Sequence, residues 1–162
     1  MTEAALIVLG SIVGAVATGG VSAWDAWRRR TAERRVAARL ILGDLYVLEE
    51  ACRIVLESGI WPDRVDIAEE FTRIDATWRE QRAAFASGVS AGEWAQVDTV
   101  YNNLNRTAPQ ANRGDQCTKA DLDSLSSLKG LVPAAQRIVL LKASSARERE
   151  AMVKEFQARS EM

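Results

Sequence analysis

The sequence predicts an all-α protein, in which one N-terminal transmembrane helix continues into a small cytoplasmic bundle of four or five helices. Three observations support this fold. Residues Ala4–Trp24 are uncharged and mostly apolar. From Thr31 onward, apolar residues recur at steps of three and four, the period of one helix face. No segment shows the sustained alternation of apolar and polar residues that is typical of a strand.

The apolar run Ala4–Trp24 has the length of a membrane span. About 20 helical residues at about 1.5 Å each cross the roughly 30 Å hydrocarbon core of a bilayer. A cleavable signal peptide would need a basic start, whereas Met1–Glu3 contains no Lys or Arg. A buried core helix is the other alternative, but a charge-free run of this length is rare in soluble cores. We therefore expect residues 1–27 to form a membrane anchor.

Residues 28–39 predict how the chain is oriented, because they hold six arginines and one glutamate. By the positive-inside rule this basic juxtamembrane segment stays in the cytoplasm, so the N-terminus lies outside and the rest of the chain inside. The expected location is the cell inner membrane. Trp24 and Trp27 suit the interfacial aromatic belt. The arginines expected to meet lipid headgroups are Arg28, Arg29, Arg30, Arg34 and Arg35.

Two helices are predicted between Thr31 and Ser87. The first covers Thr31–Ser58, is continuous with the anchor, and ends at Gly59 in a Schellman-type turn. The second runs from Val65 to Ser87. The predicted core face of the first is Val36, Leu40, Ile41, Leu45, Leu48, Cys52, Val55 and Leu56, and that of the second is Ile67, Phe71, Ile74, Trp78 and Phe85.

Two further helix starts are predicted from capping signals. Ser90 and Glu93 have capping-box spacing, which starts a helix at Ala91, and Thr118 with Asp121 offers the next start. That last helix either kinks between Gly130 and Pro133 or stops and restarts there. The expected core residues are Trp94, Val97, Tyr101, Leu104 and Ala108 in the earlier helix and Leu122, Leu125, Leu128 and Leu131 in the later one.

The short connections predict antiparallel neighbours, and so a helical bundle over residues 40–143. A long coiled coil is the rival architecture. Gly and Pro interrupt the apolar runs more often than sustained heptads would allow. Residues 144–162 are predicted to form a charged C-terminal helix or tail, whose weak apolar edge is Met152, Val153 and Phe156.

Small residues on one side of the anchor predict self-association. They form two rows at i, i+4 spacing. Such rows favour a contact between two membrane helices, because small side chains let the helices approach closely. The predicted interface comprises Gly10, Gly14, Thr18 and Ser22 in one row and Ser11, Ala15 and Gly19 in the other. A general abundance of small residues in membrane helices is the alternative explanation.

No residue pattern predicts catalysis, a metal or a cofactor. Histidine is absent, and the two cysteines are far apart in the sequence, with Cys52 expected in the core and Cys117 as a free thiol. Trp61, beside Pro62, is expected to cover the bundle end. The Asn105 sequon and the Arg113–Asp115 tripeptide would need an extracellular location. The remaining acid/base candidates are the carboxylates Glu69, Glu70, Asp98, Asp121 and Asp123.

Charge argues against nucleic acid as a partner. Residues 40–162 hold 15 basic and 19 acidic residues, whereas phosphate binding needs clustered Lys and Arg. We expect a single-pass, membrane-anchored interaction or scaffold module that contacts the lipid bilayer, a second copy of itself and an unknown protein partner. The alternatives are a membrane-active protein of the holin or toxin kind and a membrane-bound enzyme with an unrecognised carboxylate site. The Arg-, Ala- and Trp-rich composition is similar to that of small single-pass proteins of high-GC bacteria and their phages, without a shared motif.

Overall fold

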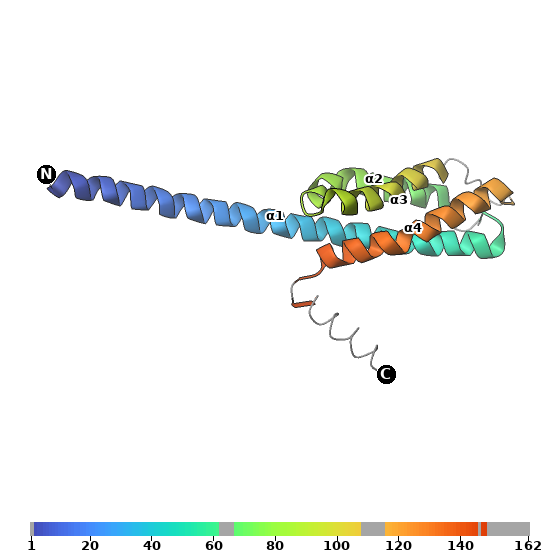
Figure 1. Cartoon of the computed structure of the whole chain (residues 1–162). Coiled ribbons are helices and arrows are strands. Elements are labelled where there is room, and N and C mark those ends of the chain that lie inside the picture. Colours follow the sequence, from blue (N-terminus) through green and yellow to red (C-terminus); the bar gives the residue numbers. More distant parts are fainter. Residues whose placement is uncertain (1, 62–66, 108–115, 146, 149–162) are drawn as a thin grey trace, which may run out of the picture. The chain divides into compact units, whose positions relative to one another are not determined.

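The computed structural model describes residues 2–61, 67–107, 116–145 and 147–148, with side chains from Gly20 onward. The chain divides into two units, Met1–Glu33 and Arg34–Met162. The described residues form four helices, and the all-α fold class is confirmed (Figure 1). An isolated antiparallel bridge joins Ile60 to Gln116. The helices are α1 (Thr2–Ser58), α2 (Ile67–Ala86), α3 (Ala91–Thr107) and α4 (Lys119–Ala143).

Membrane spanning is a separate question from the helical fold. In the part of the chain that the structure describes, no helix combines the length and the apolar character needed to cross a bilayer. Most of the apolar run Ala4–Trp24 falls on residues 1–19, whose side chains are outside the described residues. The predicted transmembrane helix therefore stays a prediction.

Within the Arg34–Met162 unit, consecutive helices run antiparallel. Each polar contact between two neighbouring helices joins the early part of one helix to the late part of the other, or joins the middle of one to the middle of the other. The contacts are Arg34 Nε–Ser87 Oγ at 2.8 Å, Arg73 Nη1–Asp44 Oδ1 at 2.9 Å, Asn105 Nδ2–Asp75 Oδ1 at 2.9 Å, Lys142 Nζ–Glu93 Oε1 at 3.0 Å and Gln136 Nε2–Glu49 Oε2 at 2.7 Å. This up-and-down order is that of a four-helix bundle.

Helix α1 buries a face that is rotated slightly from the predicted one. Val36 and Leu40, predicted to be in the core, are 55% and 46% exposed, so these two assignments were wrong. The buried positions near them are Ala37 and Ala38. The rest of the buried face is Ile41, Asp44, Leu45, Leu48, Ala51, Cys52 and Val55.

Helix α1 ends as predicted at Ser58, by a simpler turn than the Schellman motif. Gly59 has φ 68°, and its N–H donates to the carbonyl of Val55 at 2.9 Å. The N–H of Ile60, which a Schellman turn would direct to the same carbonyl, donates to the Ser58 hydroxyl instead. The carbonyl of Gly59 then accepts from the N–H of Cys117. Trp61, two residues after Gly59, is buried, as expected of a residue that covers the bundle end.

An aromatic cluster holds α2 against α3. Trp78 stacks on Tyr101 with ring centroids 4.4 Å apart and planes 4° apart, and on Trp94 at 4.9 Å. Phe85 meets Trp78 edge-on at 6.2 Å. Pairs of this kind contribute about 0.5–1.5 kcal/mol each beyond the apolar area that they bury. The predicted aromatic positions of both helices therefore form one side of the core.

The capping signals predicted both later helix starts correctly. The Ser90 N–H donates to Glu93 Oε2 at 2.7 Å, and Thr118 and Asp121 form a reciprocal capping box. Helix α4 contains Pro133 and neither stops nor restarts there. Pro133 itself is exposed, whereas Val132 and Ala135 on either side of it are buried. The burial of these neighbours in the core keeps this stretch helical.

Two glycine-to-alanine substitutions should have opposite effects on stability. Gly59→Ala should lower the free energy of unfolding by about 1–2 kcal/mol, because a Cβ disfavours the positive φ at this position. Gly130→Ala should raise it by about 0.5–1 kcal/mol, because Gly130 lies inside α4 with open space around its Cβ position. Urea unfolding followed by far-UV circular dichroism measures both. Equal effects would contradict the conformational roles assigned to these glycines.

Candidate functional site

The predicted self-association interface falls almost entirely outside the described side chains. Its members are all within α1. Ser22 is described and exposed, whereas the side chains of the other members lie outside the described residues: Gly10, Ser11, Gly14, Ala15, Thr18 and Gly19. Trp24 and Trp27, the predicted interfacial pair, are each 56% exposed, with ring centroids 5.1 Å apart. Two neighbouring indoles thus form an exposed aromatic surface on this part of α1.

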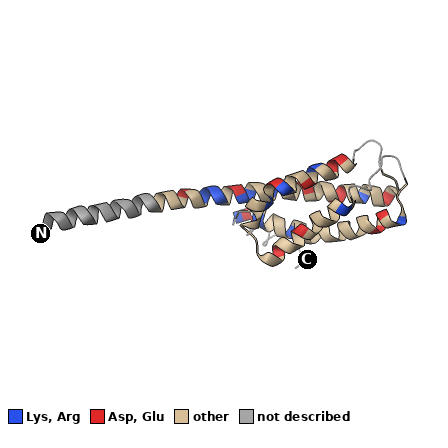
Figure 2. Cartoon of the chain, turned by 90° about the horizontal axis from the view of Figure 1, so that it is seen from above, with Lys and Arg blue, Asp and Glu red and all other residues tan. Residues whose placement is uncertain are grey.

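The predicted headgroup-binding arginines lie on one stretch of α1, where Figure 2 shows basic residues gathered. Arg28, Arg29, Arg30 and Arg35 are exposed. Arg34 differs because its Nε donates to the Ser87 hydroxyl at 2.8 Å and its side chain packs against Gly88. The structure therefore gives Arg34 a role in holding the end of α2 to α1.

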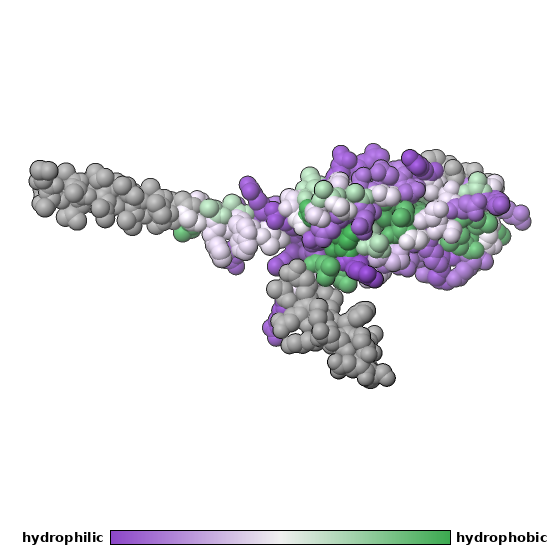
Figure 3. All heavy atoms as spheres, in the orientation of Figure 1, coloured by the Kyte–Doolittle hydropathy of each residue, from purple (hydrophilic) through white to green (hydrophobic). Residues whose placement is uncertain are grey.

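A second apolar face of α1 is exposed. We call Val36, Leu40, Gly43, Tyr46, Val47 and Ile54 the outer face of α1. Its large members are between 36% and 55% exposed. Figure 3 shows hydrophobic atoms between hydrophilic ones on one face of this unit. This surface was not predicted, because a single apolar stripe was expected on α1. The spacing of Leu40, Val47 and Ile54 could have predicted it, since residues seven positions apart lie on the same side of a helix.

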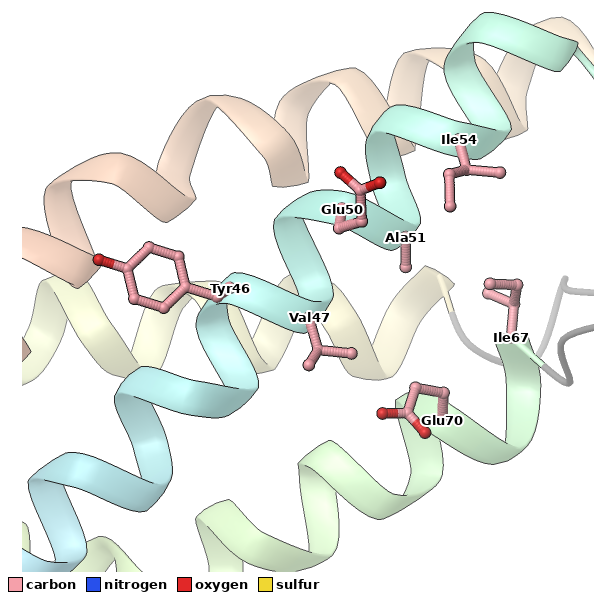
Figure 4. A pocket seen from close by; sticks show the side chains of 7 residues that line it. All are labelled: Tyr46, Val47, Glu50, Ala51, Ile54, Ile67 and Glu70. Atoms are coloured by element: carbon pink, nitrogen blue, oxygen red, sulfur yellow. The ribbon is translucent and has the colours of Figure 1, made fainter.

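The outer face borders an apolar groove between α1 and α2. Figure 4 shows Val47, Ala51 and Ile54 pointing toward α2, where Ile67 and Glu70 complete the lining, while Tyr46 points the other way. The groove has a volume of about 430 Å³. Its polar lining comes from Glu50 and Glu70 at the rim. Such a surface suits an apolar side chain flanked by cations better than it suits a phosphate or a sugar.

One ion pair joins α1 to α2, and its arginine also contacts Glu70 of the groove lining. Arg73 Nη1 donates to Asp44 Oδ1 at 2.9 Å, and its Nε donates to Glu70 Oε1 at 3.1 Å. The Asp44 side chain is 8% exposed and that of Arg73 49%, so desolvation acts mainly on the carboxylate. Burial consequently raises the pKa of Asp44 despite the opposing effect of Arg73. The hydrogen bonds to Glu70 and Asp44 raise the pKa of Arg73.

The predicted catalytic candidates do not converge on a common site. Asp121 is engaged in the cap of α4, Glu70 pairs with Arg73, and Asp98 accepts from Asn102. Asp123 and Glu69 are exposed. Of the residues described, no three His, Cys, Asp or Glu side chains are placed to hold a metal ion.

The two cysteines are free thiols in different environments, as predicted. Cys52 is buried in the core, and this burial raises its pKa to about 12. Cys117 is half-buried, and its pKa is raised by burial and then by the nearby Asp121. A raised pKa keeps a thiol protonated and poorly nucleophilic.

The chain matches no protein-family model, and no solved structure matches it. The assignment of function therefore depends on the surfaces described above.

Replacing Arg73 should lower the free energy of unfolding more than replacing its partner Asp44 does. Arg73→Met should lower the free energy of unfolding by about 1–3 kcal/mol at neutral pH, because it leaves a buried carboxylate without its cation. Asp44→Asn should cost less than about 1 kcal/mol, since a neutral amide is cheaper to bury. Thermal unfolding of both variants measures the difference, with Glu70→Gln as the control because it removes the other carboxylate partner of Arg73.

The pH dependence of that difference follows from the raised pKa of Asp44. A carboxylic acid whose folded pKa lies above its unfolded value favours folding when protonated, and this contribution is lost as pH rises through the folded pKa. The cost of Arg73→Met should therefore shrink as pH falls below the pKa of Asp44. A cost that stays constant, or a larger cost for Asp44→Asn, would contradict this electrostatic account.

Proposed function

We propose that this protein is a single-pass, membrane-anchored helical interaction module of the cell inner membrane. One observation carries the proposal: the uncharged run Ala4–Trp24 is followed at once by a segment, residues 28–39, with six arginines and one glutamate. A run of this length is sufficient to span a bilayer, and an arginine-rich flank is typical of the cytoplasmic side. The anchor would hold the Arg34–Met162 bundle beside the membrane.

The exposed tryptophans support this proposal. Trp24 and Trp27 are three residues apart, which places them on the same side of the helix, and their ring centroids are 5.1 Å apart. An indole is amphipathic and is favoured at headgroup level. The exposed Arg28, Arg29 and Arg30 follow them directly and would contact anionic headgroups, at about 1 kcal/mol per basic residue.

Self-association of the anchor is the second part of the proposal. Gly10, Gly14 and Gly19 belong to two rows of small residues with i, i+4 spacing. In lipid, the burial of apolar surface does not favour helix association, because the lipid tails are apolar too. Close packing of the backbones is what favours helix–helix contacts over helix–lipid contacts. Two anchored copies would then present two bundles at the same membrane surface.

Protein binding by the bundle is the third part. The groove between α1 and α2 is apolar, with Glu50 and Glu70 at its rim, and residues 40–162 are acidic overall. These features favour a protein partner with an apolar side chain and basic neighbours, and they disfavour nucleic acid. The identity of that partner is open.

Topology is the first test of this function. A reporter that is active only in the periplasm, fused after Met162, should give no activity, because the arginine-rich flank holds the bundle in the cytoplasm. The same reporter fused before Met1 should be active. Strong activity after Met162 would reverse the orientation.

A second test concerns the small-residue rows. Gly14→Leu should weaken self-association by about 1–2 kcal/mol, because an isobutyl group separates the helices, whereas Val13→Leu on the other side should have no effect. Both variants should insert equally, since Leu is compatible with a membrane helix. A membrane two-hybrid signal, corrected for expression, measures this. Wild-type signal in Gly14→Leu would mean that the rows make no contact.

A further inference from the structure

The floor of the groove between α1 and α2 is apolar and has a small residue at its centre. Val47, Ala51 and Ile54 of α1 point into the groove, and Ile67 of α2 completes its apolar lining (Figure 4). Val47 and Ile54 are 40% and 36% exposed, whereas Ala51 is buried. Because the methyl group of Ala51 is shorter than the side chains one turn before and after it, it leaves a hollow between them. An apolar side chain from outside can enter this hollow.

On the α1 side of the groove, two carboxylates share one arginine. Arg53 Nε donates to Glu50 Oε2 at 2.8 Å, and Arg53 Nη1 donates to Glu57 Oε2. The hydrogen bond from Arg53 lowers the pKa of Glu50, to which Lys129 of α4 adds a smaller effect, so Glu50 is ionised at neutral pH. The Glu50 side chain is 56% exposed. It is therefore open to a further cation from outside.

The α2 side of the groove has the same arrangement. Glu70 and Asp44 share Arg73, and the side chain of Glu70, which lines the groove, is 28% exposed. The lining residues include two carboxylates and neither Lys nor Arg. On each side, two carboxyl groups thus share the guanidinium of one arginine. This charge distribution favours a ligand with a cation on each flank and disfavours an anionic ligand.

The floor favours recognition of a helix through its side chains. Because α1 is a continuous helix here, its backbone N–H and C=O groups are paired within the helix and offer no edge to an extended strand. Val47, Ala51 and Ile54 follow one another at steps of four and three residues and extend about 10 Å along α1. A partner helix with apolar residues at i, i+4 and i+7 has the same spacing and can lie along this row.

We propose that the groove between α1 and α2 binds one amphipathic helix of a partner protein, with Lys or Arg on both flanks of its apolar edge. A large apolar side chain enters the hollow at Ala51, and its apolar neighbours one turn away contact Val47 and Ile54. The cations on the two flanks pair with Glu50 and Glu70. This docking rests on the protein-binding part of the proposed function, whose partner it specifies, and it uses residues of the bundle alone.

Peptide binding to the full-length chain in a non-ionic detergent tests this assignment. The probe is a designed amphipathic helix of about 18 residues, since shorter isolated helices are marginal in water, with Leu along one edge and Lys on both flanks. Fluorescence anisotropy of the labelled peptide should show saturable binding beyond that to detergent alone. A matched peptide with Glu in place of every Lys keeps the apolar edge and should bind at least about tenfold more weakly.

Substitutions in the chain locate the bound peptide. Ile54→Gln should raise the Kd at least about tenfold by making the floor polar, whereas Leu40→Gln, at an exposed apolar residue of α1 outside the groove, should leave it unchanged. Glu50→Gln combined with Glu70→Gln should raise the Kd at least about threefold. Glu80→Gln, which neutralises an exposed carboxylate elsewhere on α2, should not. Circular dichroism confirms that each variant is folded.

Three outcomes would overturn the proposal. The first is equal binding of the Lys and Glu peptides, and the second is unchanged binding to the Ile54→Gln variant. The third is self-association of the full-length chain that Ile54→Gln abolishes, because the exposed Val36 and Leu40 of a second copy would then occupy the groove. Failure of the topology test would leave the expected peptide binding unchanged, since the anchor makes no contact with the peptide.

Discussion

Helix α1 has apolar residues on two faces, whereas the bundle buries only one of them. Ile41, Leu45 and Leu48 are fully buried, while Leu40 and Val47 of the same turns remain exposed. Neighbouring exposed apolar residues of this kind are typical of interaction surfaces. The groove beside α2 follows from this division of α1, because Val47 and Ile54 of the outer face are among the residues that line it.

Polar contacts determine how the bundle is assembled around α1. Hydrophobic burial is non-directional, and so does not by itself fix which turns face each other. The buried Asp44 does, because its carboxylate needs Arg73 of α2 within hydrogen-bonding distance. Gln136 of α4 donates to Glu49 on the other side of α1. These contacts hold the helices in register at some cost in desolvation, and they make one arrangement more favourable than its neighbours.

The sequence was most informative where one local signal has one structural outcome. Ser90 with Glu93 and Thr118 with Asp121 predicted two helix starts to the residue, and Gly59 predicted the end of α1. Such signals succeed because the capping atoms lie within one turn of each other. The buried aromatic residues of α2 and α3 were also predicted, since helical period and hydrophobicity agree there.

Prediction failed where a choice between two local solutions depended on distant residues. Val36 and Leu40 fit the helical period as well as Ala37 and Ala38 do, and which of the two pairs is buried is decided only in the assembled bundle. Pro133 stays within α4 because its neighbours are buried against the rest of the bundle. The outer face of α1 was missed for the same reason: exposure is a property of the assembled bundle. Asp44 gave no sign of burial, because its partner lies far away in the sequence.

The central claim is that the chain from Thr31 onward folds by itself as a helical bundle. The most direct test is to isolate that fragment. Far-UV circular dichroism and sedimentation equilibrium on residues 31–162 should give a helical, cooperatively unfolding monomer or a weakly associating one, because α1 to α4 bury one common core. A stable, elongated dimer would instead favour a coiled coil through α1. A spectrum dominated by strand or coil would contradict the bundle itself.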